Sequence, residues 1–316
     1  MIGGAARFTL ATALGFYFRR IELLEAARVP AGPLLVVANH PNSLADAAVL
    51  ASALPRPFAI VATAALFRFP PLAWLLRRMG VIPVNRAGYD PRAMRTVAAP
   101  FEAVYAALEP GGAVLIFPEG ITYDEPALRP FKSGPARMAL ELEHRPGGKL
   151  GLHVLPVGLH YPSRGRYRGD ALAHAGPALA AADFLEGYPE RKKEAVQRLT
   201  DAIESSLKEL VVHIPAADQA DLVAGLLRLG EGAQTPSAAE DLERRRKTAA
   251  GVASLYKERP AEGAAFAARL AAYESLLARL KVDDAAVRAA AGEKLGRRES
   301  AVRAVAAVVL LPVALW

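Results

Sequence analysis

No cysteine occurs among the 316 residues of this chain. Disulfide bonds, thiolate metal ligands and a cysteine nucleophile are therefore excluded. The composition fits a reducing compartment, in which disulfides are rare, but does not require one. A Gly-x-Ser-x-Gly motif is also absent, so the sequence has no signature of the usual serine nucleophile of hydrolases.

Long hydrophobic runs are the second absence. Hydrophobic residues make up 53% of the chain, yet no run reaches the roughly 20 apolar residues of a membrane-spanning helix. The formal net charge is +7, but no zinc-finger, RNP-type or basic-zipper pattern is present. Because many arginines stand singly beside apolar clusters, the charge suits an anionic membrane surface or a phosphorylated substrate better than a nucleic acid.

The N-terminal residues 2–18 are almost wholly apolar and are followed by Arg19 and Arg20. A secretory signal peptide has the reverse order, with the charge before the apolar run. We predict that residues 1–20 form an amphipathic helix at a membrane interface, with Phe16–Phe18 near the surface and the arginines at the headgroups. A helix packed on its own domain fits the same pattern.

Short apolar runs alternate with segments of helical spacing between residues 21 and 214. Continuous apolar runs of this kind are typical of strands buried in parallel sheets. The alternation predicts an α/β domain with a mixed, mostly parallel sheet flanked by helices. The predicted strands are 33–38, 57–62, 80–84, 113–117, 151–159 and 172–175, and the predicted helices are 44–54, 91–108, 135–142 and 190–210.

An Ala-rich segment of helical spacing follows residue 214. We assign residues 215–300 to an all-helical C-terminal domain, in which Ser237 and Glu240 form a capping-box pattern. Residues 301–316 are apolar but too few to span a membrane alone. They are expected to form either an interfacial anchor or the first half of a spanning helix. The predicted helices of this domain are 218–229, 237–257, 262–280 and 283–295.

The stretch Asn39–Asp46 places a histidine at the turn between a predicted strand and a predicted helix. Two interpretations are open. Ser43 and Asp46 fit a capping box, which would make His40 an ordinary turn residue. Alternatively, His40 is a general base whose tautomer is fixed by the Asp46 carboxylate.

Other polar residues follow the predicted strands. Arg86 could bind a phosphate through its guanidinium, although a lone surface arginine would look the same. Glu119 and Gly120 follow the strand at 113–117, at the end where α/β folds bind ligands. Lys132 precedes a predicted helix, whose N-terminal N–H groups favour anions.

The segment 66–78 combines aromatic residues, leucines and arginines. This pattern predicts an exposed apolar patch with a cationic border, although buried packing is also compatible with it. Together with the N-terminal run, it predicts a peripheral or monotopic protein held at a membrane by residues 2–20 and Phe67–Trp74.

Four blocks stand in order along the chain: Asn39–Asp46, Gly80–Arg86, Phe117–Gly120 and Val154–Gly158. In this order and spacing, they resemble the four motif blocks of the glycerophospholipid acyltransferases, the family that builds lysophosphatidate and phosphatidate. The resemblance covers about residues 15–210 and rests chiefly on Phe-Pro-Glu-Gly and Ile-Pro-Val-Asn-Arg behind Asn-His-Pro-Asn-Ser.

Two features depart from the commonest pattern of that family. Five residues separate His40 from Asp46 instead of four, and Thr122–Asp124 stands where an arginine is usual. Both features are similar to the branch that contains the fungal glycerol-3-phosphate and dihydroxyacetone-phosphate acyltransferases. The residues that match the third block of that branch are Asp124, Pro126, Leu128, Pro130, Lys132 and Gly134.

The resemblance implies transfer of a fatty acyl group from an acyl thioester, acyl-CoA or acyl-carrier protein, to a hydroxyl of glycerol-3-phosphate or 1-acyl-glycerol-3-phosphate in phospholipid biosynthesis. His40 and Asp46 would be catalytic. Arg86 and Lys132 would bind the acceptor phosphate, and Glu119 would hold the glycerol backbone. The implied substrate-binding set is Asn42, Ser43, Arg86, Glu119, Gly120 and Lys132.

The implied partners are membrane lipid, the thioester donor and the glycerol-phosphate acceptor, at the cytoplasmic face of a membrane and without nucleic acid. No metal and no cofactor beyond the acyl donor is implied. Two alternatives are a catalytically impaired lipid-binding scaffold of the same fold and a metal-dependent phosphohydrolase that uses His40 and Asp46.

Overall fold

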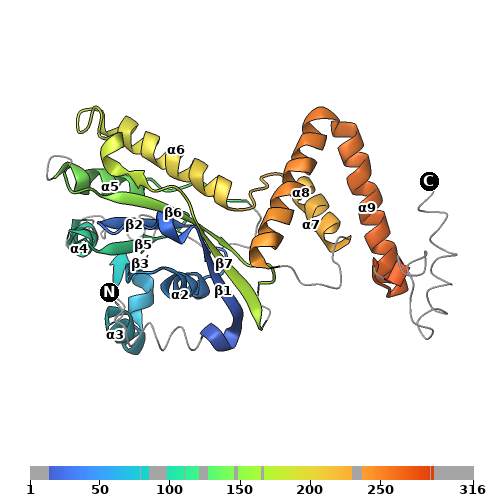
Figure 1. Ribbon diagram of the computed structural model, residues 1–316, viewed down its shortest axis with the longest axis horizontal. Helices are drawn as coiled ribbons and strands as arrows, with labels where there is room; N and C mark the ends of the chain where they lie inside the picture. Colours follow the sequence, from blue (N-terminus) through green and yellow to red (C-terminus); the bar gives the residue numbers. More distant parts are fainter. Residues whose placement is uncertain are drawn as a thin grey trace. The chain divides into compact units, whose positions relative to one another are not determined.

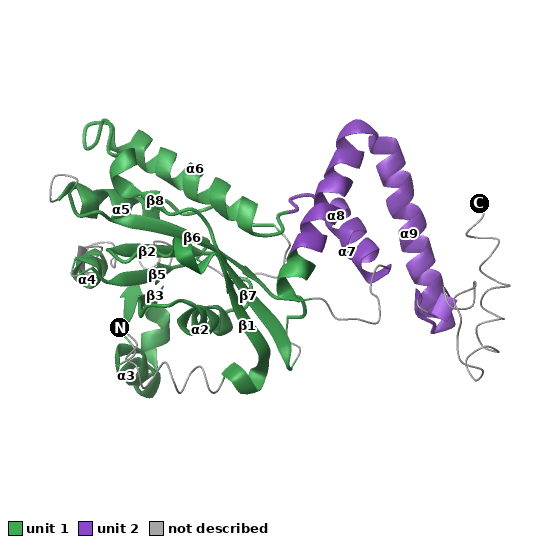
Figure 2. Ribbon diagram, viewed as in Figure 1, with its two compact units in different colours: residues 1–213, 237–242 green, residues 214–236, 243–316 purple. Residues whose placement is uncertain are grey.

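A computed structural model of the chain describes residues 14–78, 80–84, 98–109, 111–120, 127–145, 149–164, 167–229, 237–284 and 286–287. The chain divides into two compact units, shown in Figure 2. Unit 1 comprises residues 1–213 and 237–242, and unit 2 comprises residues 214–236 and 243–316.

An eight-stranded sheet organises unit 1, with strand order β1-β7-β6-β2-β5-β3-β4 and β8 beside β6. The five strands β6, β2, β5, β3 and β4 are parallel to one another, whereas β7 and β8 are antiparallel to β6. Strand β1 is parallel to β7 and therefore antiparallel to β2. The strands are β1 (Phe18–Leu24), β2 (Leu34–Ala38), β3 (Ala59–Thr63), β4 (Val81–Val84), β5 (Ala113–Ile116), β6 (His153–His160), β7 (Gly169–Ala175) and β8 (Leu179–Ala180).

Helices cover both faces of this sheet (Figure 1). The α-helices of unit 1 are α2 (Leu44–Ala53), α3 (Pro70–Arg78), α4 (Ala98–Leu108), α5 (Gly134–His144) and α6 (Lys192–Leu210). Side chains of β2 alternate between the two cores: Leu35 and Val37 pack with α4, α5 and α6, whereas Leu34 and Val36 pack with α2. Because both faces are covered, β2 is a continuous apolar run with no exposed residue.

The predicted α/β class with a mixed, mostly parallel sheet is confirmed, and so are the predicted strands and helices that fall on described residues. Three short 3₁₀ helices occur in the described chain, at Ala26–Arg28, Ala64–Arg68 and Ala181–Phe184. The predicted helix at 91–108 is described from Ala98 onward, as α4.

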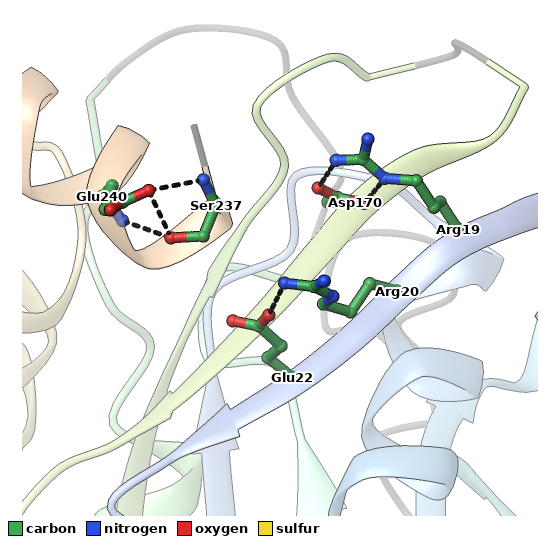
Figure 3. A network of polar contacts seen from close by, with 6 residues as sticks. All are labelled: Arg19, Arg20, Glu22, Asp170, Ser237 and Glu240. Carbon is green, nitrogen blue, oxygen red and sulfur yellow. Dashed lines mark hydrogen bonds and ion pairs between the residues drawn. The ribbon is translucent and has the colours of Figure 1, made fainter. Parts of the chain in front are cut away.

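The prediction of one helix over residues 1–20 is wrong at its end. Residues 14–17 are helical, but β1 begins at Phe18, and residues 1–13 lie outside the described chain. Arg19 forms a bidentate ion pair with Asp170 of β7, through Nε at 2.9 Å from Oδ1 and through Nη2 to Oδ2, and Arg20 pairs with Glu22 at 3.0 Å (Figure 3). Arg19 and Arg20, which we predicted to lie at lipid headgroups, are therefore paired with carboxylates of the protein itself.

Unit 2 is helical in its described part. Helix α7 (Ala217–Leu229) packs against α9 (Pro260–Leu280), where Arg228 and Glu274 form an ion pair at 2.7 Å. Helix α8 (Ala238–Glu258) has its first turn in unit 1 and the rest in unit 2. The predicted helix 283–295 and the tail 301–316 lie almost wholly outside the described residues. Within the described chain, none of the helices is both long and apolar enough to cross a membrane.

Candidate active site

The register of the sheet brings three distant chain segments to one edge. Val37 of β2 pairs with Ile116 of β5, and Ala38 pairs with Val157 of β6. Because these strands are parallel, the residues that follow them emerge side by side. His40 follows β2, the turn at 117–120 follows β5, and Tyr161 follows β6.

His40 and Asp46 form a hydrogen-bonded pair at this edge. The imidazole Nδ1 lies 2.9 Å from Oδ2 of Asp46. Asp46 is fully buried in the first turn of α2, whereas the His40 side chain is 19% exposed. A carboxylate can only accept, so Nδ1 carries the proton and the lone pair of Nε2 remains available to take a proton from a bound hydroxyl.

The capping-box interpretation of Ser43 and Asp46 is wrong. Ser43 makes no side-chain cap, and Asp46 accepts a hydrogen bond at 2.8 Å from the backbone N–H of Asn42. By contrast, the box at Ser237 and Glu240 is confirmed. There, Glu240 accepts from the Ser237 N–H at 2.8 Å, and the Glu240 N–H donates to Ser237 Oγ at 3.2 Å (Figure 3). Similar spacings thus give a helix cap at one position and a histidine–carboxylate pair at the other.

Tyr161 is the third partner of Asp46, and sequence analysis missed it. Its hydroxyl donates to Asp46 Oδ1 at 2.7 Å, across 115 positions in the chain. Burial, together with the nearby Asp46 carboxylate, raises the pKa of the Tyr161 hydroxyl far above its ordinary value, so the group remains a donor. The sequence block 154–158 ends three residues before Tyr161. The available signal was the predicted strand that contains this block, because the residues just after its end include Tyr161.

Asn39 ties the histidine turn to β6. Its side-chain amide donates to the Leu159 carbonyl at 3.1 Å, and its Oδ1 accepts from the Leu159 N–H at 2.6 Å. The residue is only 6% exposed. These bonds continue the sheet pairing for one residue beyond β2, which fixes the backbone that carries His40.

Phe117 supports the imidazole from the β5 side. Its ring is stacked on His40, with the centroids 3.9 Å apart and the planes at 14°. The contact fixes the plane of the histidine ring in addition to the hydrogen bond at Nδ1. The two motif blocks that contain His40 and Phe117 therefore meet in space.

Glu119, Gly120 and Lys132 also lie together beyond β5. Glu119 is 4% exposed, and its Oε2 accepts a hydrogen bond at 2.8 Å from the Arg129 backbone N–H. Lys132 is exposed, and its backbone N–H donates a hydrogen bond to the Pro118 carbonyl at 3.1 Å. A Cβ on Gly120 would lie 2.8 Å from Lys132 Nζ. The turn therefore places an ammonium group directly over Gly120.

Ser43 has an unusual backbone conformation, with φ 52° and ψ −127°. The Asn42 carbonyl accepts from the Ala45 N–H at 3.1 Å, so the turn has the geometry of type II′, which normally has glycine at this position. A non-glycine residue there costs on the order of 1–3 kcal/mol. The strain lies next to His40 and Asp46, in the turn that joins them.

Arg86 lies outside the described residues, so its predicted place at the site stays a prediction. In the part of the chain that the structure describes, no group of three or more His, Asp or Glu side chains is placed to hold a metal ion.

Known proteins are similar to part of this chain. The acyltransferase family model matches residues 20–160, which reach from β1 to the end of β6 and include His40 and the turn at 117–120, whereas Tyr161 follows the matched range. Residues 20–160 are therefore similar to the acyltransferase family, and the curated relatives include glycerol-phosphate and acylglycerol-phosphate acyltransferases.

Two curated relatives illustrate the similarity. Glycerol-3-phosphate O-acyltransferase 2 of Saccharomyces cerevisiae is 34% identical over 131 residues, which are 41% of this chain and 17% of the yeast protein. The chloroplastic 1-acyl-sn-glycerol-3-phosphate acyltransferase LPAT1 of Arabidopsis thaliana is 31% identical over 144 residues, 46% of this chain and 36% of that protein. The chain thus spans well under half the length of these relatives.

A solved structure is also similar. The 1-acyl-sn-glycerophosphate acyltransferase PlsC of Thermotoga maritima matches 65% of this chain and 80% of its own, with 16% identity and a TM-score of 0.43.

Proposed function

We propose that the protein transfers a fatty acyl group from an acyl thioester, acyl-CoA or acyl-carrier protein, to a hydroxyl of a glycerol-phosphate acceptor. The observation that supports this most directly is the bond of 2.9 Å between His40 Nδ1 and the buried Asp46 carboxylate. It leaves Nε2 as a base at an edge of the sheet where the segments after β2, β5 and β6 lie side by side.

In this proposal, Nε2 of His40 removes the proton of the acceptor hydroxyl while its oxygen attacks the thioester carbonyl carbon. The C–O bond forms and the carbonyl oxygen becomes an oxyanion. The C–S bond then breaks, and the departing thiolate takes the proton from the imidazolium. Asp46 stabilises the positive charge of the imidazolium between the two proton transfers.

Backbone N–H groups beside His40 are suited to the oxyanion. The N–H groups of Asn42, Ala45 and Asp46 are already engaged, to the Asp46 carboxylate, the Asn42 carbonyl and the Ser43 carbonyl respectively. Those of Ser43 and Leu44, two exposed residues at the positive end of α2, are the proposed oxyanion donors.

Lys132 and Arg86 are the proposed phosphate-binding residues. Lys132 lies over Gly120, whose N–H donates to the carbonyl of Phe117, the residue that stacks on His40. An ammonium group there can hold the phosphate while the hydroxyl reaches Nε2. Glu119 as a ligand of the glycerol backbone, and Asn42 and Ser43 as substrate contacts, stay predictions.

We place this reaction at the cytoplasmic face of a membrane, where an acylated acceptor and product would reside. The cysteine-free sequence and the basic net charge of +7 support this placement.

The decisive experiment is an assay of the purified full chain in detergent. Acyl-CoA and acyl-carrier-protein donors are offered against glycerol-3-phosphate, dihydroxyacetone phosphate and 1-acyl-glycerol-3-phosphate. Acylation of one acceptor, lost in a folded His40→Ala variant, supports the proposal. Absence of transfer with every pair, by protein that is folded and lipid-bound, would instead favour the scaffold alternative.

A further inference from the structure

Helix α3 exposes two of its large apolar side chains, Trp74 and Leu75. Ala73 is 3% exposed, whereas Trp74 is 60% and Leu75 is 47% exposed, and Phe69 before the helix is 63% exposed. A surface helix normally buries its large apolar residues and exposes polar ones. Ala73 and Leu76 face the core, so Trp74 and Leu75 make the exposed face of α3 a contact surface.

Exposed apolar residues elsewhere in unit 1 gather at the same edge of the sheet. Tyr17 precedes β1, Leu44 begins α2 next to the histidine turn, and Tyr167 precedes β7. Because β1 and β7 are antiparallel to β2, their starts lie where β2 ends. Figure 1 shows α3, the dark-blue turn before β1 and the start of β7 on its lower side. The large hydrophobic residues exposed in the described part of unit 1 are Phe16, Tyr17, Leu44, Phe69, Trp74, Leu75 and Tyr167, here called the apolar rim.

Arginines border the rim at α3. Arg68, Arg77 and Arg78 are exposed, and in the described part of the chain none of them forms an ion pair with a carboxylate. The Arg78 guanidinium lies 5.2 Å from the centre of the Trp74 ring. Aromatic side chains with unpaired cations above them match the apolar boundary and the phosphates of a lipid surface.

We propose that the apolar rim docks on an anionic phospholipid bilayer. Trp74, Leu75 and Phe69 enter the boundary between headgroups and acyl chains, and the α3 arginines bind lipid phosphates. Docking of this edge turns the partly exposed His40 side chain toward the bilayer, so a lipid substrate can reach Nε2 without leaving the membrane. This last consequence rests on the proposed function, whereas the docking does not.

Vesicle flotation of the full chain tests the docking without any acyl transfer. A double variant, Trp74→Ser with Leu75→Ser, should bind vesicles of phosphatidylcholine with phosphatidylglycerol about tenfold more weakly or worse. Phe266→Ser is the matched control, because Phe266 is an exposed aromatic residue of unit 2, 42% exposed. It should bind as the unaltered chain does.

The arginines give an independent arm. Arg77→Gln with Arg78→Gln should weaken binding to anionic vesicles by about fivefold per residue and leave binding to pure phosphatidylcholine unchanged. Equal vesicle binding by the double apolar variant and the unaltered chain overturns the proposal. So does a change of oligomeric state with unchanged vesicle binding, which would make the rim a contact between copies of this chain.

A different observation points to a positioning residue. The Asp46 carboxylate accepts from His40 and Asn42 on Oδ2 and from the Tyr161 hydroxyl on Oδ1. Tyr161 is itself held, because its ring packs on Phe18 of β1 with centroids 5.9 Å apart, and it is 7% exposed. The geometry points to Tyr161 as the residue that fixes the rotation of Asp46 and limits how strongly it attracts the imidazolium proton.

The test is Tyr161→Phe, which keeps the ring and its packing. Loss of the donor concentrates negative charge on Asp46, so the imidazolium is stabilised and the acidic limb of the kcat profile should shift to higher pH. The kcat value should fall about tenfold, with little change in KM for either substrate. Tyr105→Phe is the control, since Tyr105 is a buried tyrosine of α4 outside the site.

A merely structural role predicts another pattern. Tyr161→Phe would then lower the melting temperature and leave the acidic limb in place. An unchanged pH profile and an unchanged kcat in folded Tyr161→Phe overturn the assignment. Because the variant is compared with active protein, failure of this test is distinct from failure of the proposed acyl transfer.

Discussion

Replacement of Asp46 by asparagine separates catalysis from folding at the proposed site. An asparagine can keep its oxygen toward His40 and Asn42 and turn its amino group toward Tyr161, whose hydroxyl can rotate to accept. All three hydrogen bonds of Asp46 therefore have neutral replacements. In Asp46→Asn, neutral hydrogen bonds replace charge-assisted ones, so we expect the free energy of unfolding to decrease by about 1–3 kcal/mol.

The expected loss of activity is much larger than the loss of stability. The amide carries no negative charge, so it cannot stabilise the imidazolium that forms when His40 takes the hydroxyl proton. We expect kcat to fall about 10²–10⁴-fold, the range of a positioned base. In His40→Ala, kcat should fall by as much. The free energy of unfolding should also decrease by about 1 kcal/mol, because the substitution removes the stacking on Phe117.

Turnover and melting temperature are measured together on each variant. Asp170→Asn is the matched control, because Asp170 is another buried carboxylate, 6% exposed, that binds Arg19 far from His40 along the chain. It should lose stability and keep its activity. Full activity in a folded His40→Ala variant would refute the proposed mechanism, and an Asp46→Asn variant as active as Asp170→Asn would refute the role of Asp46.

Three further outcomes are expected. Arg86→Ala should raise KM for the phosphorylated acceptor far more than for the acyl donor, since a charge-assisted pair is worth roughly 2 kcal/mol; equal effects in steady-state kinetics would make Arg86 structural. Gly120→Ala should displace Lys132 and raise the same KM, because φ is +70° and Nζ lies 2.8 Å from the new Cβ; unchanged kinetics would remove Lys132 from the site. Burial, with a smaller contribution from Lys208, lowers the pKa of His213, whose Nδ1 accepts the Leu128 N–H at 3.0 Å. The unfolded chain therefore takes up this proton first, so stability should fall as pH drops below about 6.5, and His213→Asn, which keeps an acceptor, should reduce that slope in denaturant titrations at several pH values.

The sequence by itself determined the class of fold and most of its elements. A continuous apolar run such as 34–38 is typical of a strand that is covered on both faces. The helices that cover it are predicted by the helical spacing of their apolar residues. Helix α6 was predicted to within two residues, because its apolar stripe includes Val196, Leu199 and Ile203. Local periodicity is a property of neighbouring residues, so a single sequence reveals it.

The N-terminal strand shows where local pattern misled. Residues 18–24 follow an apolar run, and their arginines suggested a lipid interface. Parallel pairing with β7 makes this segment a strand of the sheet, and the carboxylate of Asp170, about 150 positions later, binds Arg19. Nothing within the segment itself indicates that partner, so a helix ending in arginines was the natural prediction.

The site divides in the same way. Sequence spacing nominated His40 and Asp46 but left the helix cap open as the other explanation, and a similar pattern at Ser237 is indeed a cap. Tertiary structure decided against the cap, because Asp46 binds His40 and the Asn42 N–H, and the parallel register of β2, β5 and β6 places Phe117 and Tyr161 against the pair. Hydrogen bonds and ring contacts depend on distance in space, and across a sheet that distance is set by strand order, which a single sequence does not encode locally.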